Sequence, residues 1–458
     1  MRPDTHADTI IQNVFLVTFD RDATVIADGA LAIRDGVIVD RGSTAEVTAR
    51  WSADQRVFGG GQIAIPGLTD AHFHTAQSLM RGMLATLQQR TRLRVPTWRE
   101  YYLPFEAALS PDDIALSGEF AYATMLRTGT TNVLEAGGPH PERMGEAAQR
   151  AGIRATVTAS TMDGGSRVPP SMIMTAEEAV ARNIEVVEAF PAEVDGSRRV
   201  TGGMSLRQVI TCSPELVQTI HAEARRRGVT VHTHLAEGTY EIDYCLEHFG
   251  RRPVDHLIDL GVFTRTLHCA HSILVDDAEI ASFAVRGVTV CHCAKGNYAI
   301  GAAPAARMWR RGVGVGLGTD GVATLGTLDM FRVAMLTGLG QQLVEATPTH
   351  NRNGIPPEEP LQMAITGGAL AGRQSDVIGS LEVGKRADVV LLTTTGPDAA
   401  AYASEEAFLY ECASGRDVTT VLVDGEVVVS DGEVQTLDYE RVCAVAAARQ
   451  AELANVIA

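Results

Sequence analysis

The sequence is short of positive charge, of long apolar runs and of aromatic rings. Its 458 residues include 56 acidic and 39 basic side chains, giving a formal net charge of −17, and only 5% are aromatic. Because nucleic acids are bound through basic surfaces, this balance argues against a nucleic-acid partner. No apolar run reaches the roughly 18 residues that suggest a membrane-spanning helix. We therefore expect neither a membrane span nor a membrane partner.

Signals of export and of disulfide cross-linking are also lacking. Residues 1–8 contain no apolar core of the kind found in secretory signal peptides. The seven cysteines are an odd number scattered along the chain, which is typical of reduced thiols. The glycines at 59–61 precede an apolar stretch but open no helix, so they do not predict a phosphate-binding loop. These absences predict a cytoplasmic protein.

The most informative feature that is present is the histidine pair His72 and His74, which closes the apolar run 63–71. Side chains two residues apart on a strand point to the same face, so these imidazoles can hold one metal ion. Nitrogen ligands of this kind suit zinc and its transition-metal neighbours. A His-x-His pattern alone is common, and this pair gains its weight from three segments downstream.

Each of those segments is a short apolar strand that ends in a group able to bind a metal or move a proton. They are 229–237 with His234 and Glu237, 266–271 with His268, and 313–321 with Asp320. In a (β/α)8 barrel the active site lies at the C-terminal ends of the strands, so distant segments can meet there. His72 and Asp320 are about 250 residues apart, which is the usual length of that fold.

Strands and helices are predicted to alternate through this region. Four further strands are expected at 130–135, 153–159, 205–211 and 287–291, and helices lie between strands, for example at 177–189 and 215–227. Eight strands alternating with helices predict an α/β protein, a (β/α)8 TIM barrel.

The flanks predict hairpins instead, with turns at Asp35-Gly36 and Asp424-Gly425. Neither flank alone has enough strands to bury a core. We therefore expect 1–61 and 376–458 to form a small β-sandwich domain, with the metal-dependent barrel at 62–375.

With these motifs in place, the chain resembles the amidohydrolase superfamily. It is most similar to the aminohydrolases that include S-adenosylhomocysteine/methylthioadenosine deaminases, guanine deaminase and the s-triazine hydrolases. The shared motifs span nearly the whole chain: 66–74, 79–83, His234 with Glu237, His268-Cys269, Asn297, 318–321 and 379–388.

The resemblance implies one divalent metal ion, zinc with iron as the alternative, held by four residues: His72, His74, His234 and Asp320. It makes Glu237 the proton shuttle and His268 the strand-six histidine that stabilises developing charge, while Asp320 also accepts a proton. Binuclear relatives carry a carboxylated lysine on strand four. The segment 205–211 has no lysine, which favours a single metal.

These groups predict a hydrolytic deaminase of an amino-substituted purine, pterin, pyrimidine or triazine. A metal such as zinc lowers the pKa of bound water from 15.7 to about 7. Glu237 would take the water proton during attack on a ring carbon and return it to the departing amine.

Two alternatives stay open. The first is hydrolysis of a ring amide or of a non-amino substituent, as in triazine hydrolases. The more remote one is a non-catalytic binding protein on the same fold. The partner is a small heterocyclic molecule, and the resemblance implies a homo-oligomer, a dimer or higher.

Four residues are the candidate substrate contacts: Trp98, Tyr102, Cys212 and Asn297. Trp98 and Tyr102 lie in a long connection, and such loops are often functional while aromatic rings suit planar ligands. Packing of a helix or a subunit contact would explain them equally well. Adenosine-type deaminases often have histidine where this chain has Cys212, so the substrate ring stays open.

The other histidines receive plainer interpretations. His221, His248 and His256 are expected at the surface, and His232 in the barrel interior, one layer below His234. His271 is expected to be either a hydrogen-bonding partner behind the site or polar packing.

Overall fold

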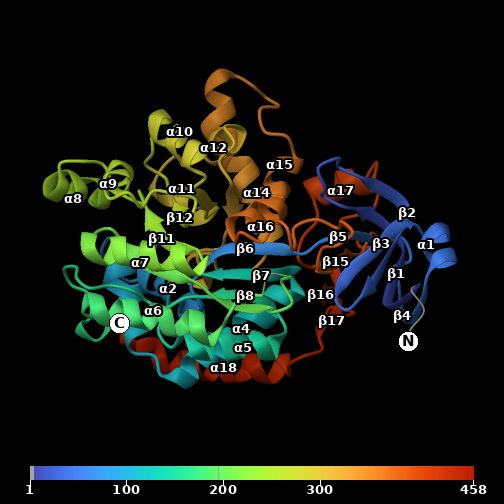
Figure 1. Cartoon of the computed structure of the whole chain (residues 1–458), viewed down its shortest axis with the longest axis horizontal. Coiled ribbons are helices and arrows are strands. Elements are labelled where there is room, and N and C mark those ends of the chain that lie inside the picture. Colours follow the sequence, from blue (N-terminus) through green and yellow to red (C-terminus); the bar gives the residue numbers. More distant parts are fainter. Residues whose placement is uncertain (1–4, 194, 458) are drawn as a thin grey trace.

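Parallel strands and helices alternate through the middle of the chain, which confirms the predicted (β/α)8 barrel (Figure 1). The computed structural model describes residues 5–193 and 195–457. The barrel strands are β6 (Leu68–Phe73), β7 (Thr130–Glu135), β8 (Arg154–Val157), β9 (Val200–Gly202), β10 (Met204–Gln208), β11 (Val231–Leu235), β12 (Leu267–His271), β13 (Thr289–His292) and β14 (Val315–Leu317).

The helices that return the chain between these strands begin and end at recognisable signals. Ser110 and Thr175 form capping boxes with the residues three positions on, and Gly152 and Gly228 end helices in the left-handed conformation. The main helices on the barrel are α4 (Pro111–Arg127), α5 (Pro141–Ala151), α6 (Ala176–Ala189), α7 (Pro214–Arg227), α8 (Thr239–Phe249), α9 (Pro253–Asp259), α10 (Asp277–Arg286), α11 (Ala294–Ile300), α12 (Ala305–Arg310) and α14 (Met330–Gln341). The predicted helices 177–189 and 215–227 are thus confirmed to within one residue.

The fourth barrel strand is divided between two pairings. β9 pairs with β8, and after Gly203 the chain continues as β10, which pairs with β11. Gly202 must be small, because a Cβ there would lie 2.5 Å from the carbonyl oxygen of Val186 on α6. The ring closes between β14 and β6, where the amide of Asp320 donates to the carbonyl of His72 at 3.0 Å. This closure brings the first and last predicted ligands side by side.

The two ends of the chain share one sheet beside the barrel (Figure 1). Its order is β18-β17-β16-β15-β5-β1-β2-β3, and β4 also pairs with β1. The strands are β1 (His6–Val17), β2 (Val25–Arg34), β3 (Val37–Ser43), β4 (Ser52–Phe58), β5 (Ile63–Pro66), β15 (Val389–Leu392), β16 (Val418–Val423), β17 (Glu426–Ser430) and β18 (Glu433–Val434). The hairpin turns fall at Asp35-Gly36 and Asp424-Gly425, all four with positive φ, as expected for tight hairpins.

This sheet curves over on itself to enclose an apolar core. Ile38 from one end and Leu422 from the other belong to the same buried cluster, together with Ile11 and Leu391. A second, smaller buried cluster includes Ile10 of β1, and the helix α1 (Thr44–Arg50) contributes Val47 to it. The domain limits 1–61, 62–375 and 376–458 stay a prediction, and β5, at 63–66, pairs within the flanking sheet.

The remaining helices lie outside this regular pattern. They are α2 (Met83–Gln88), α3 (Leu103–Ala107), α13 (Val322–Leu325), α15 (Glu358–Gln362), α16 (Gly368–Ala371), α17 (Glu405–Glu411) and α18 (Tyr439–Leu453). The last of these returns along α4 at the base of the view in Figure 1, where Arg449 pairs with Asp113. Within 5–193 and 195–457, no helix has the length and apolarity needed to cross a bilayer.

A buried ion pair joins the barrel to the flanking sheet. Arg154 on β8 is 1% exposed and donates two hydrogen bonds of 3.1 Å to the carboxylate of Asp388, just before β15. Asp388 also accepts the amide of Asp424 at 2.8 Å. A bidentate arginine–carboxylate pair is geometrically demanding, so it fixes the relative orientation of the two parts.

We predict that Arg154→Met lowers the free energy of unfolding by about 3–5 kcal/mol, because it leaves Asp388 buried without its counter-charge. Denaturant unfolding followed by circular dichroism measures the change. Arg198→Met, which removes an exposed pair with Glu193, is the matched control and should cost less than about 1 kcal/mol. Equal stability of the two variants would contradict the structural role of Arg154.

Candidate active site

The strand ends of the barrel bring the four predicted metal ligands together. Nε2 of His72 lies 3.4 Å from Oδ1 of Asp320, and Nε2 of His74 lies 3.8 Å from the same oxygen. Nε2 of His234, on β11, is 3.2 Å from Nε2 of His74. Two nitrogens and a carboxylate oxygen thus converge from β6 and the turn after β14, with a third nitrogen from the opposite wall.

A fifth residue, His271 at the end of β12, completes the group. Two sets of side chains are close enough to bind one ion: His72 with His234 and His271, and His72 with His74 and Asp320. His72 belongs to both sets. The cluster therefore offers five ligand-bearing side chains around a single centre.

The structure does not bring His268 to this centre. Its Nε2 is 2.8 Å from the carbonyl oxygen of Ala71, and its Nδ1 is 2.9 Å from Oγ1 of Thr289. In the strand register His268 lies opposite His232, one layer below His234. Both ring nitrogens are thus engaged inside the barrel, and His271 occupies the place beside the metal ligands that the sequence assigned to His268.

The imidazoles of the three predicted histidine ligands are neutral. Burial, reinforced by neighbouring histidines and by Arg207, holds the pKa values of His72, His74 and His234 well below their ordinary range. His234 uses Nδ1 to donate to the carbonyl of Arg207 at 2.7 Å, which leaves its Nε2 as a lone pair aimed into the site. Neutral imidazole is the form that binds metals.

Buried nitrogen atoms without partners also fit a metal ion. Nε2 of His72 and Nδ1 of His74 have no hydrogen-bond partner among the described residues. A buried polar atom left unpaired is costly, so such atoms call for a ligand, a water or an ion. His72 is held from behind by His232, whose Nε2 is 2.8 Å from Nδ1 of His72. Metal-bound histidines are usually oriented by a second hydrogen bond of this kind.

Four non-glycine residues at the ends of β11, β12 and β14 adopt left-handed backbone conformations. They are Ala236 at φ 51°, His271 at φ 69°, Ser272 at φ 45° and Asp320 at φ 65°. Strain of this kind collects at functional sites, where the surrounding structure holds it in place. They turn the chain as it leaves the barrel strands, and two of them, His271 and Asp320, belong to the sets of side chains that could bind an ion.

Glu237 stands at the edge of this group, three residues after His234. Its Oε2 accepts the hydroxyl of Tyr240 at 2.6 Å and Nε2 of Gln208 at 2.7 Å. The carboxylate lines the same pocket as His74, His234 and Asp320.

That pocket has a volume of about 320 Å³, and four of the five clustered side chains line it: His74, His234, His271 and Asp320. Trp98 and Tyr102, two predicted substrate contacts, lie in its wall with Leu84, Leu93 and Ile300. Among the described residues, its acidic lining consists of Glu237 and Asp320. An apolar wall with a few polar groups suits a small planar ring.

The other two predicted substrate contacts lie behind the pocket wall. Asn297 is fully buried, and its Oδ1 lies 3.0 Å from Nδ1 of His271 while its Nδ2 donates to His292. Cys212 is buried next to the carbonyl of Thr161, and burial raises the pKa of its thiol to about 12. Asn297 therefore orients His271, and Cys212 packs.

Several polar residues of the site escaped the sequence prediction. Arg207 lines the pocket and is paired with the buried Glu106 at 3.1 Å, while Gln208 and Tyr240 contact Glu237. Tyr240 lies in the first turn of α8, only three residues after Glu237, and this short separation in the sequence could have identified it. The predicted surface position is wrong for His221 and His256, which are buried, and confirmed for His248.

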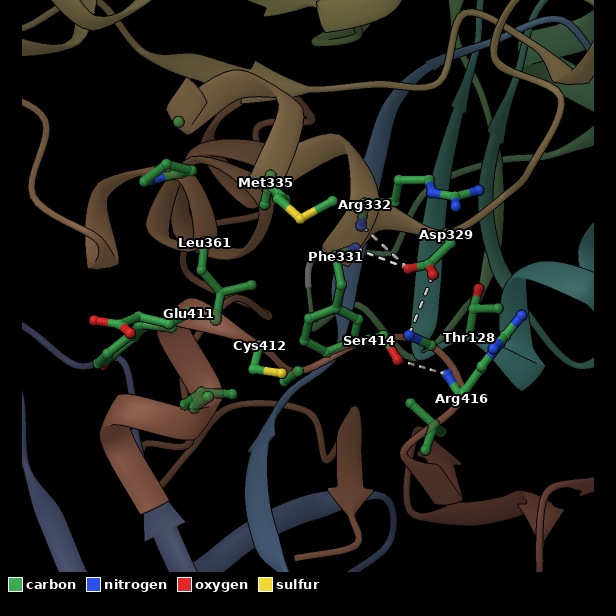
Figure 2. A pocket seen from close by; sticks show the side chains of 18 of the residues that line it. Thr128, Asp329, Phe331, Arg332, Met335, Leu361, Glu411, Cys412, Ser414 and Arg416 are labelled. Atoms are coloured by element: carbon green, nitrogen blue, oxygen red, sulfur yellow. Dashed lines mark hydrogen bonds between the residues drawn. The ribbon is translucent and has the colours of Figure 1, made fainter. Parts of the chain in front are cut away.

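A larger groove, of about 950 Å³, lies elsewhere, between α14, α17 and the end of α4 (Figure 2). Asp329 caps α14 there and also accepts the amide of Gly415 at 3.2 Å. None of the five clustered side chains lines this groove. Its size therefore does not make it the catalytic site.

The chain belongs to the amidohydrolase family, whose profile matches residues 63–428. A 5-methylthioadenosine/S-adenosylhomocysteine deaminase of Desulforudis audaxviator is 33% identical over 93% of each chain. The crystal structure of an adenosine deaminase from Xanthomonas campestris with bound zinc is similar at a TM-score of 0.89 and 26% identity, covering 99% of this chain and 100% of that one. The fold is also that of a zinc complex of atrazine chlorohydrolase from Arthrobacter aurescens, at a TM-score of 0.85, 23% identity and coverage of 97% and 100%.

We predict that His72→Ala abolishes stoichiometric metal binding, since His72 is common to both sets of ligands. Metal content per chain, measured by inductively coupled plasma mass spectrometry after dialysis, should fall from one ion toward none. His248→Ala removes an exposed imidazole and should keep the full metal content. Full occupancy in His72→Ala would rule out the site described here.

Proposed function

We propose that this protein is a metal-dependent hydrolytic deaminase of an amino-substituted nitrogen heterocycle. The observation that carries the proposal is the placement of Glu237 in one small pocket with a cluster of neutral histidines and Asp320. Relatives named as deaminases, one of them at 33% identity, support the same reaction. The proposed ion is zinc, in keeping with the zinc bound in the similar adenosine deaminase structure.

Four residues would hold the ion: His72, His74, His234 and Asp320. When bound, zinc supplies a water nucleophile that is activated near neutral pH. Because the imidazoles are already neutral, no proton has to leave them on metal binding. Asp320 can also accept a proton, as its carboxylate retains a second oxygen.

Glu237 moves the proton. In the first step it takes a proton from the attacking water as the C–O bond forms at the ring carbon. In the second it gives that proton to the exocyclic nitrogen as the C–N bond breaks and ammonia leaves. The second water proton, on the oxygen added to the ring, passes through Asp320 to the neighbouring ring nitrogen, which leaves the ring carbonyl as the other product. A positioned acid–base group of this kind contributes about 10²- to 10⁴-fold to the rate.

His271 takes the part predicted for His268, which is to stabilise charge that develops on the attacked ring. Burial disfavours a charge on it, but Glu237, Cys293 and Asp320 outweigh burial and raise the pKa of His271 well above its ordinary value. Asn297 fixes the ring through Nδ1. The other ring nitrogen of His271 is then the one available to the substrate.

The second candidate function is hydrolysis of a non-amino substituent, favoured by the fold shared with atrazine chlorohydrolase. The substrate in either case is a small heterocycle, because the pocket of about 320 Å³ is at the lower end of ligand-pocket sizes. A homo-oligomeric state and a cytoplasmic location stay predictions.

Ammonia release across a panel of aminopurines, pterins, pyrimidines and s-triazines tests the reaction. We expect ammonia from at least one ring, in protein whose metal content is assayed in the same sample. Full metal occupancy with release of chloride or an alkyl group, and no ammonia, would replace deamination by substituent hydrolysis.

A second test is Glu237→Gln, which keeps the size of the side chain but cannot carry the proton. We expect kcat to fall by about 10²- to 10⁴-fold at unchanged metal content. Activity near that of the parent protein would exclude Glu237 as the proton shuttle.

A further inference from the structure

We propose that Tyr240, Gln208 and Trp98 form a clamp that saturates one oxygen of Glu237, Oε2, and reserves the other, Oε1, for the transferred proton. These three residues, the Glu237 clamp, are positioning residues. The inference rests on the proposed role of Glu237.

The contacts are close and converge on one atom. Oε2 of Glu237 lies 2.6 Å from the hydroxyl of Tyr240 and 2.7 Å from Nε2 of Gln208. The same Tyr240 hydroxyl is 3.1 Å from Nε2 of Gln208 and 3.0 Å from Nε1 of Trp98. Oε1 has no hydrogen bond to any described residue.

The direction of every hydrogen bond follows from the chemistry of the donors. An indole N–H and an amide NH2 can only donate, so Trp98 and Gln208 both donate to the tyrosine oxygen. Its two lone pairs are then used, and its single hydrogen must point to Glu237. Gln208 has two amide hydrogens and donates one to Tyr240 and the other to Glu237.

A proton on Glu237 therefore belongs on Oε1. If Oε2 were protonated, its hydrogen would face the donors of Tyr240 and Gln208, and no free lone pair is left on the tyrosine oxygen to accept it. Oε1 carries the proton between water and leaving group without breaking any bond of the clamp. Preorganisation of this kind avoids rearrangement during the reaction.

The clamp is itself held rigidly. Trp98 belongs to a buried apolar cluster with Leu103, Met162 and Met172, against which the ring of Tyr240 packs. Burial, with the nearby carboxylates of Glu237 and Glu241, raises the pKa of Tyr240 well above its ordinary value, so the hydroxyl keeps its hydrogen. Glu241 accepts the amide of Glu237 at 3.0 Å and fixes the backbone from the other side.

Tyr240→Phe removes one donor from Oε2 while keeping the ring. We expect kcat to fall about 10- to 100-fold, the range for loss of a hydrogen bond to a charged group, with KM changed by less than about threefold. We expect the same fall in kcat for Gln208→Met, which also removes one donor from Oε2. The metal content of both variants should stay at the parent value. Tyr244→Phe, one turn further along α8, is the matched control and should keep the parent kcat.

The decisive comparison repeats Tyr240→Phe in the Glu237→Gln background. Because the clamp acts only through the glutamate, the second substitution should cost less than about twofold there. A full 10-fold loss in that background, or parent-like kcat in Tyr240→Phe alone, overturns the clamp. A parent protein that turns over no ring at all would instead overturn the proposed function.

Discussion

One buried carboxylate, that of Asp70, holds the site together. Oδ1 accepts the amides of His72 and Thr319 at 3.3 and 3.1 Å, and Oδ2 accepts the Thr319 hydroxyl at 2.6 Å. Asp70 thereby ties the first barrel strand to the last, and Asp320 follows Thr319 directly. Burial raises the pKa of Asp70 to about 7 against the opposing effect of these hydrogen bonds. An unpaired carboxylate in this position would be costly, so the two strands are fixed in one register. The distances among the ligands depend on that register.

The alternation of side chains along a strand explains why four of the five clustered side chains could be predicted from the sequence and why the fifth, His271, could not. The pairs His72/His74 and His232/His234 obey strict alternation, so counting residues places them on the inner face in two layers. The same count puts His268 inward and His271 outward. His271 nevertheless reaches the centre, because its backbone turns into the left-handed conformation where β12 ends. No glycine or asparagine marks that turn, and a sequence pattern gives no warning of it.

The fold was easier to predict than the pocket for a related reason. Helix caps and hairpin turns are local, so Ser110, Thr175 and the two Asp-Gly turns identify element boundaries directly. Contacts in the pocket are set by side-chain reach across strands. Asn297 is a good example. It lies in the first turn of α11, and its amide group contacts His271 and His292 and does not line the pocket. Arg207 is another example, because its guanidinium forms a buried ion pair with Glu106, about a hundred residues earlier in the chain.

The shared fold of deaminases and a chlorohydrolase raises the question of what decides the leaving group. Metal ligands and a base serve both reactions, since each begins with attack of water on a ring carbon. The reactions differ afterwards: chloride departs as a stable anion, whereas an amine must receive a proton before the C–N bond can break. In the proposed mechanism, a glutamate whose two oxygens are unequal, with Oε2 of Glu237 saturated by Tyr240 and Gln208, delivers that proton from a defined atom. Such directed delivery has a purpose when nitrogen leaves and little when a halide does. The geometry around Glu237 therefore favours deamination over substituent hydrolysis more strongly than the metal cluster does.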